Sequence, residues 1–161
     1  MGEHPISQQI IDLLKSHNYW YETFEHEPVR TSEEAAVLRP GYTLQQGAKA
    51  IIVRAKVSGE GKKFVMLVMP ADRRFDGTKA KAILHSKDLR FATEEEVESI
   101  TDGVKPGGVP PFGNLFGLSV LTDPTLYKNE KIIFNAGRTC SIAIKSTDYK
   151  QLATPLVAEI V

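Results

Sequence analysis

A glycine- and proline-rich loop is the segment whose residue types point most directly to chemistry. Residues 107–113 read Gly-Gly-Val-Pro-Pro-Phe-Gly. Glycines let backbone N–H groups approach a ligand, and prolines fix the path of the chain, so such a loop can donate hydrogen bonds to a carbonyl or an oxyanion. An ordinary rigid surface turn has the same composition. Long structured loops usually have a function, which favours the first interpretation.

Polar groups also stand at the ends of two expected strands. Lys49 begins the apolar run 48–53, and its ammonium could hold a phosphate or a carbonyl if it faces a cleft. Strand alternation could equally turn it into solvent. Asn135 and Arg138 follow the expected strand at 131–134, at a glycine turn, where binding groups are common. A plain turn explains them equally well.

His26 and Cys140 are the other reactive side chains, and neither belongs to a recognisable catalytic motif. His26 could act as a general base, but no serine, cysteine or carboxylate completes a triad, so a structural hydrogen-bonding role is favoured. Cys140 is expected to be a buried small hydrophobe. A disulfide framework, a metal site and a nucleotide cofactor are not predicted, because no CxxC pair or glycine-rich nucleotide signature is present and the histidines are scattered at His4, His17, His26 and His85.

The elements that must position these groups follow from periodicity and turn chemistry. Apolar spacing and capping residues predict helices at 7–17, 31–38, 76–84 and 93–100, and helical turns at 124–127 and 147–152. Short β-rich runs predict strands at 19–24, 48–57, 64–69, 118–121, 131–134, 141–144 and 156–160. A long loop is expected at 101–117. The pattern indicates an α+β domain with a mixed sheet, centred on a hairpin of 48–57 and 64–69.

Length and composition limit the organisation of the chain. With 161 residues, of which 42% are hydrophobic, the chain can fill one core, so we expect one domain over residues 1–161. Its apolar runs are too short for a membrane-spanning helix, and the opening residues do not resemble a leader peptide. A cytoplasmic protein is therefore expected.

Charge is balanced overall but not locally. The chain has twenty basic and twenty acidic residues, yet residues 49–90 contain eleven basic residues against four acidic ones, a net charge of +7 that leaves −7 elsewhere. Solvated strand edges and helix faces explain such a run. A surface that faces RNA is the alternative.

Several segments, in this order, together resemble one family, the YbaK/prolyl-tRNA-synthetase-associated domain. They span most of the chain: 24–36 (FEHEPVRTSEEAA), 48–53 (AKAIIV), 69–72 (MPAD), the loop at 107–113, Asp123, and 134–137 (FNAG). The resemblance implies a mixed, mostly antiparallel and partly barrel-like sheet flanked by helices. It also implies hydrolysis of the ester between a wrongly attached amino acid and the terminal adenosine of a tRNA, without a cofactor or a metal.

The resemblance also assigns roles to residues. It implies that Lys49, which matches the family's lysine, anchors the terminal phosphate or the substrate carbonyl, and that the backbone amides of Gly107 and Gly108 grip the aminoacyl group. The expected substrate-binding residues are His26, Thr31, Val109, Pro110, Pro111, Phe112, Gly113, Asp123, Asn135, Gly137 and Arg138. An aminoacyl ester is already activated, so orienting it and a water molecule suffices without a protein nucleophile.

The expected substrate is mischarged tRNA(Pro), and prolyl-tRNA synthetase is a possible partner. Members that remove alanine carry a histidine shortly after the strand end, whereas this chain reads Ala136-Gly137-Arg138, which is closer to variants that remove cysteine. Two alternatives stay open: a module that binds the charged tRNA end without cleaving it, and a regulatory protein that docks on a synthetase.

Overall fold

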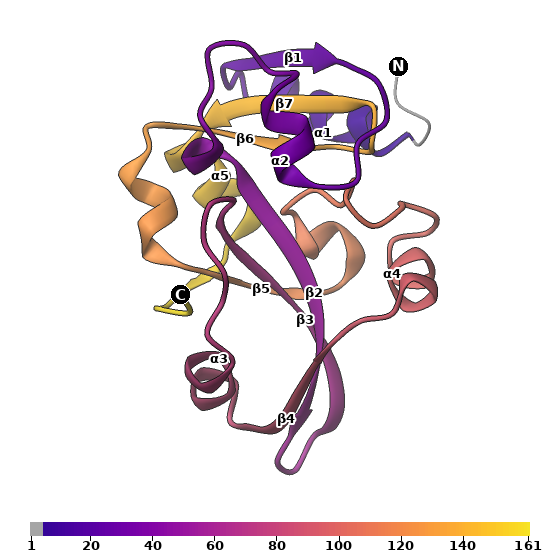
Figure 1. The fold of residues 1–161 in the computed structure, drawn as a ribbon, viewed down its shortest axis with the longest axis vertical. Helices are drawn as coiled ribbons and strands as arrows, with labels where there is room; N and C mark the ends of the chain where they lie inside the picture. Colours follow the sequence, from indigo (N-terminus) through magenta and orange to yellow (C-terminus); the bar gives the residue numbers. More distant parts are fainter. Residues whose placement is uncertain (1–4) are drawn as a thin grey trace.

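The computed structural model describes residues 5–161, apart from the side chain of Ser32, so His4 lies outside the described residues. The strands form two sheets (Figure 1), one with the order β1-β7-β6 and one with the order β4-β2-β3-β5-β8. A parallel bridge between Gly47 and Ile133 links them, and they do not close into a barrel. The α+β class is confirmed, but a single sheet was wrong, because residue alternation fixes the faces of a strand and not its neighbours.

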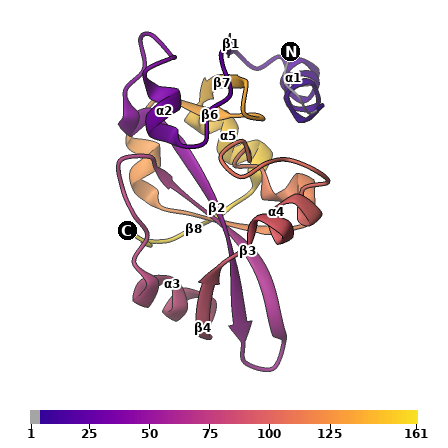
Figure 2. The same ribbon diagram turned by 45° about the vertical axis from the view of Figure 1, so that its right-hand side comes forward.

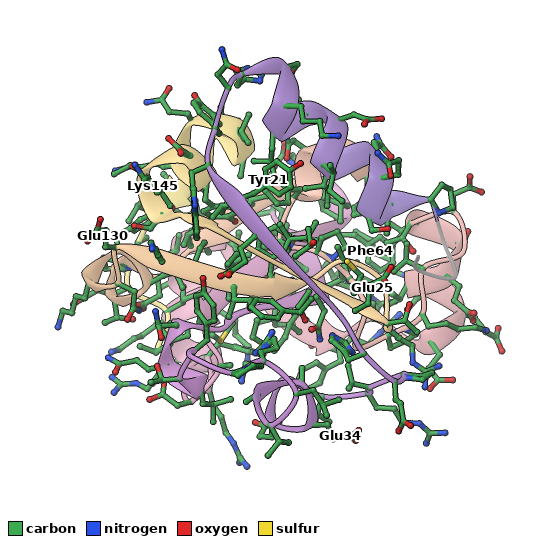
Figure 3. All side chains as sticks on the ribbon, turned by 90° about the horizontal axis from the view of Figure 1, so that it is seen from above. Tyr21, Glu25, Glu34, Phe64, Glu130 and Lys145 are labelled. Atoms are coloured by element: carbon green, nitrogen blue, oxygen red, sulfur yellow. The ribbon has the colours of Figure 1, made fainter. Side chains whose placement is uncertain are left out.

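The three-stranded sheet is antiparallel throughout and consists of β1 (Tyr21–Glu25), β6 (Lys131–Asn135) and β7 (Cys140–Lys145). Helices α1 (Ile6–Ser16) and α2 (Ser32–Ala36) lie on opposite sides of it (Figures 2 and 3), with Glu34 marking α2 in Figure 3. In β6, Ile132 and Phe134 join the main core with α1. Alternation therefore turns Ile133 and Asn135 toward the side of α2.

The five-stranded sheet is built on the long hairpin of β2 (Ala48–Val57) and β3 (Gly61–Pro70), which projects away from the smaller sheet (Figure 1). On one side, β4 (Ser86–Phe91) runs antiparallel to β2. On the other side, β5 (Ser119–Thr122) runs parallel to β3, and β8 (Leu156–Val157) runs parallel to β5. The central hairpin is as predicted. Strand β4 was not predicted, and the strand expected at 156–160 is shorter than expected.

Each face of the larger sheet is covered by apolar residues. Ile52 and Met66 belong to the main core shared with α1 and the smaller sheet, and Cys140 is buried there as predicted. Val53 and Leu67 point to the opposite face, where they pack with Ile160 near the C-terminal end and with α3 (Gly77–Leu84). Lys49 follows the alternation of Val53, so it lies on this second face at the start of β2.

Capping residues begin the helices where the sequence indicated. Thr31 caps α2, Asp76 caps α3, and Thr93 forms a capping box with Glu96 at α4 (Glu94–Ile100). The remaining helical segments are η1 (Leu44–Gln46), η2 (Gly113–Phe116), η3 (Pro124–Lys128) and α5 (Ser146–Ala153). Within residues 5–161, no helix has the length and apolar character needed to cross a membrane.

Candidate active site

A cavity of about 260 Å³ lies where the smaller sheet, the start of β2, the region of α2 and the 107–113 loop meet. Strand ends supply several of its walls, since Ala48 to Ile51 begin β2 and Ile133 to Asn135 end β6. Five of the residues predicted from the sequence line it: Thr31, Lys49, Gly107, Val109 and Asn135. The cavity therefore brings together the lysine, the loop and the amide that stand far apart in the sequence.

Lys49 lies half-buried in this cavity and, over residues 5–161, makes one side-chain hydrogen bond. Its Nζ donates a hydrogen bond of 2.5 Å to the backbone oxygen of Arg73. Burial lowers the pKa of Lys49, and Arg74 adds to that effect, while Glu33 and Asp72 oppose it. An ammonium has three N–H groups, so two are available to a ligand that enters the cavity.

The 107–113 loop is held in place through its carbonyl oxygens. Asn135 Nδ2 donates to the oxygen of Gly107 at 2.8 Å, and the N–H of Gly137 donates to that of Gly108 at 2.7 Å. Tyr149 Oη donates to the oxygen of Pro111 at 2.7 Å. These three contacts tie the loop to the smaller sheet and to α5. The wall of the cavity formed by Gly107 and Val109 is thus anchored from behind.

Gly108 does not take the catalytic position predicted for it. Its N–H donates to the backbone oxygen of Lys105 at 3.0 Å, and it does not line the cavity. A Cβ at this position would lie 2.7 Å from the carbonyl carbon of Gly137, closer than side chains pack. Gly108 is therefore required for close backbone packing, and its amide is already used within the loop.

The second half of the loop belongs to the core and not to the cavity. Phe112 is fully buried and packs edge-on against Phe134 and Tyr149, with ring centroids 5.3 Å apart in each pair. Gly113 leaves room for Val120. Pro110 and Pro111 are buried as well and do not line the cavity. Pro110, Pro111, Phe112 and Gly113 thus pack into the core, as an apolar loop segment does when a core is available, and the substrate-binding role predicted for them stays a prediction.

Asp123 likewise has a structural role in place of the predicted one. It is buried away from the cavity, where Oδ1 accepts from Thr125 and Oδ2 accepts from the backbone N–H groups of Ile160 and Val161. Burial alone would raise the pKa of Asp123, but these hydrogen bonds lower it. The carboxylate holds the C-terminal segment against η3.

His26 and Arg138 fix the segment that precedes α2, and Gly137 contacts Gly108 in the loop. None of the three lines the cavity. The His26 ring contacts the backbone oxygen of Glu27 through Nδ1 at 2.9 Å and Ser141 Oγ through Nε2 at 2.8 Å. Arg138 Nε donates to the oxygen of Val29 at 3.0 Å. Both ring nitrogens of His26 are engaged, so the structural interpretation of this histidine is favoured.

Arg39 is the functional candidate that sequence reasoning missed. It lines the cavity although the residue is only 2% exposed. Its Nη1 donates to Asn135 Oδ1 over a long 3.4 Å, while Nε and Nη2 have no hydrogen-bond partner among the residues that the structure describes. Burial lowers the pKa of Arg39 to about 10. An arginine before Pro-Gly resembles an ordinary helix end, and nothing local in the sequence indicates that it is buried.

The electrostatic character of the cavity is cationic. Among the described residues that line it, three carry positive charge, namely Arg30, Arg39 and Lys49, and Glu33 is the one carboxylate. Over residues 5–161, no group of three or more His, Cys, Asp and Glu side chains is placed to hold a metal ion. The arrangement is suited to an anionic or acceptor-rich ligand.

Comparison with known proteins places this site in a family. Residues 26–152 match the aminoacyl-tRNA editing domain. Two proline--tRNA ligases, from Ralstonia pickettii (strain 12J) and Caldicellulosiruptor bescii, are 31% and 32% identical over 64% and 69% of the chain, and the matched part is 18% of the length of each.

Solved structures share the fold. A hypothetical protein superposes with a TM-score of 0.80 at 22% identity, covering 94% of this chain and 98% of its own. A proposed trans-editing enzyme for prolyl tRNA synthetase superposes with a TM-score of 0.79 at 23% identity, covering 98% and 97%. The family match extends over the cavity residues from Arg30 to Asn135. The chain therefore belongs to the aminoacyl-tRNA editing domain family.

Proposed function

We propose that this chain hydrolyses the ester that joins a wrongly attached amino acid to the terminal adenosine of a tRNA. The observation that carries the proposal is the shared cavity, in which the Lys49 ammonium and the anchored wall of Gly107 and Val109 lie together. Membership of the editing family supports the reaction class. The reaction belongs to translation in the cytoplasm.

The cavity offers a way to hydrolyse an activated ester without a protein nucleophile. Lys49 has N–H groups left for a carbonyl or a phosphate, and the loop wall fixes the position of the acyl group. His26, the histidine considered as a base, does not line the cavity and is engaged on both ring nitrogens. Water is then the attacking group, and the protein contributes orientation and positive charge at the ester oxygen.

The proposed substrate is tRNA(Pro) carrying cysteine, alanine or another small amino acid, with the chain acting in trans and prolyl-tRNA synthetase as a possible partner. The relatives named as proline--tRNA ligases support tRNA(Pro) as the tRNA in this proposal. Nearly complete mutual coverage with a proposed trans-editing enzyme supports action in trans. The Ala136-Gly137-Arg138 turn, which lacks the histidine of alanine-removing members, favours cysteine.

A panel of mischarged tRNAs tests the proposal. The purified chain is incubated with tRNA(Pro) carrying alanine, cysteine or serine, and with other tRNAs carrying the same amino acids, and loss of the ester is followed over time. We expect at least one ester on tRNA(Pro) to be lost faster than its spontaneous rate. Binding of every charged tRNA with none hydrolysed would instead support a non-catalytic binding module.

A further inference from the structure

Arg39 is a buried cation without a counter-charge. The residue is 2% exposed, and among the described residues no carboxylate forms a salt bridge with it. Two of its three guanidinium nitrogens have no hydrogen-bond partner within the described part of the chain. Burying a charge is costly unless it is paired. A bound ligand with acceptor oxygens would supply the partner that the guanidinium lacks.

The surroundings keep the guanidinium at the cavity wall. Asn135 accepts from Nη1, but its Oδ1 is shared with Ser141 Oγ, which donates to it at 3.2 Å. Gly47 has no side chain, and a Cβ there would lie 3.5 Å from Nη2. Asn135 also donates to the loop oxygen of Gly107, so the guanidinium and the loop wall are connected through one amide. Arg39 is thereby held in the buried part of the cavity wall.

The loop has one of its backbone donors already engaged within the protein. The Gly108 amide is used on Lys105, and the oxygens of Gly107 and Gly108 are already acceptors for other groups. Arg30, Thr31, Arg39 and Lys49 are side-chain donors that line the cavity, and Arg39 is the buried one among them. A guanidinium presents its donors as a planar fork suited to two oxygens, whereas an ammonium acts as a point charge.

We propose that the inner end of the cavity is an oxyanion-binding site whose principal donor is the Arg39 guanidinium. Its assignment to the substrate rests on the proposed function. Water adds to the ester carbonyl, the carbonyl electron pair moves to the oxygen, and Arg39 stabilises that negative charge. The intermediate then expels the ribose oxygen, which takes up the proton released by the water. A phosphate of the terminal nucleotide also presents negatively charged oxygens, and it is the other group that the site could hold.

Binding of inorganic phosphate tests the site without any turnover. Phosphate is titrated by calorimetry and by thermal shift into the wild type, Arg39→Met, Arg39→Lys and the control Arg54→Met, which removes an arginine that does not line the cavity. We expect phosphate affinity to fall about tenfold to hundredfold in Arg39→Met, less in Arg39→Lys, and not in Arg54→Met. Because it relieves an unpaired charge, Arg39→Met should melt at or above the wild-type temperature in phosphate-free buffer.

The kinetic arms identify which oxyanion occupies the site. A lower kcat at unchanged KM in Arg39→Lys assigns it to the ester oxygen, whereas a higher KM at unchanged kcat assigns it to the terminal phosphate. Phosphate binding that is absent from the wild type, or equal in Arg39→Met, overturns the inference even if the enzyme deacylates tRNA. Arg39-dependent phosphate binding in a protein that hydrolyses no ester would uphold the site and refute the proposed reaction.

Discussion

At the residue scale, Lys49 combines two properties that matter for catalysis. It has free N–H groups in the cavity, and its pKa is lowered, chiefly by burial. The protonated form is the one that can stabilise negative charge on a carbonyl or phosphate. Because burial disfavours that form, the charge is lost at a lower pH than for a solvent-exposed lysine.

This shift predicts an alkaline limit to activity. After subtraction of spontaneous hydrolysis, the deacylation rate should fall as the pH rises toward the ordinary lysine pKa and Lys49 loses its proton. In Lys49→Arg the cation persists, so the residual rate should show no such fall. The pH profiles of both proteins under single-turnover conditions provide the measurement. An identical alkaline fall in the two profiles would show that another group titrates.

Residues of the site were only partly predictable. Lys49 and Asn135 were identified because resemblance and strand-end positions both pointed to them, and Gly107 because resemblance and the loop composition did; all three line the cavity. Asp123 was assigned to the pocket on resemblance, yet its carboxylate accepts hydrogen bonds from the C-terminal backbone. Arg39 could not be found, because burial of a charged side chain depends on elements that come together only in three dimensions.

At the element scale, the 107–113 loop depends on one close approach of backbones. Gly107 has φ +90°, and a Cβ there would overlap the carbonyl oxygen of Arg30 at the rim of the cavity. Gly59, in the β2–β3 turn, has a similar φ of +83° but nothing within 4 Å. The two glycines share the cost of a left-handed backbone, and only Gly107 adds a collision.

Alanine at these two positions separates strain from contact. We expect Gly107→Ala to lose more stability than Gly59→Ala, for which backbone strain alone costs about 1 kcal/mol, and to raise KM because the rim must move. Urea unfolding and deacylation kinetics of both variants are the measurements. Equal losses of stability with an unchanged KM in Gly107→Ala would show that the loop does not shape the cavity.

Elements were predicted well where a local signal exists and poorly where pairing decides. The capped starts of α3 and α4 were correct because Asp76 and Thr93 act on their own helix. Strand β4 was missed because its Ser-Lys-Asp-Leu-Arg-Phe sequence carries the charges of an edge strand and lacks a continuous apolar face. The division into two sheets depends on long-range pairing that no short window of sequence contains.

At the scale of the whole molecule, the charge asymmetry of the sequence becomes a spatial one. Residues 49–90, with a net charge of +7, form β2, β3, α3 and β4, and α3, β4 and the hairpin end of β2 and β3 lie farthest from the smaller sheet (Figure 1). Some of these charges are paired locally, as Arg90 is with Glu96 and Lys63 with Glu60. A surface that faces RNA stays the alternative to solvated strand edges and helix faces for this segment.

The molecule as a whole is organised around one meeting point. The cavity forms where β2 begins in the larger sheet and β6 ends in the smaller one, so the site exists only when both sheets are packed together. This explains why no single stretch of the sequence has the pattern of an active site. Binding groups at the ends of strands from two sheets are held by the rigid parts of the fold.

Single-turnover deacylation of cysteine-charged or alanine-charged tRNA(Pro) by the wild type and Lys49→Ala tests the central claim most directly. Lys15→Ala, at the exposed end of α1, is the matched control. We predict ester loss above the spontaneous rate for the wild type and Lys15→Ala, and a rate at least about 100-fold lower for folded Lys49→Ala. Equal rates for the wild type and Lys49→Ala would contradict an active site in this cavity.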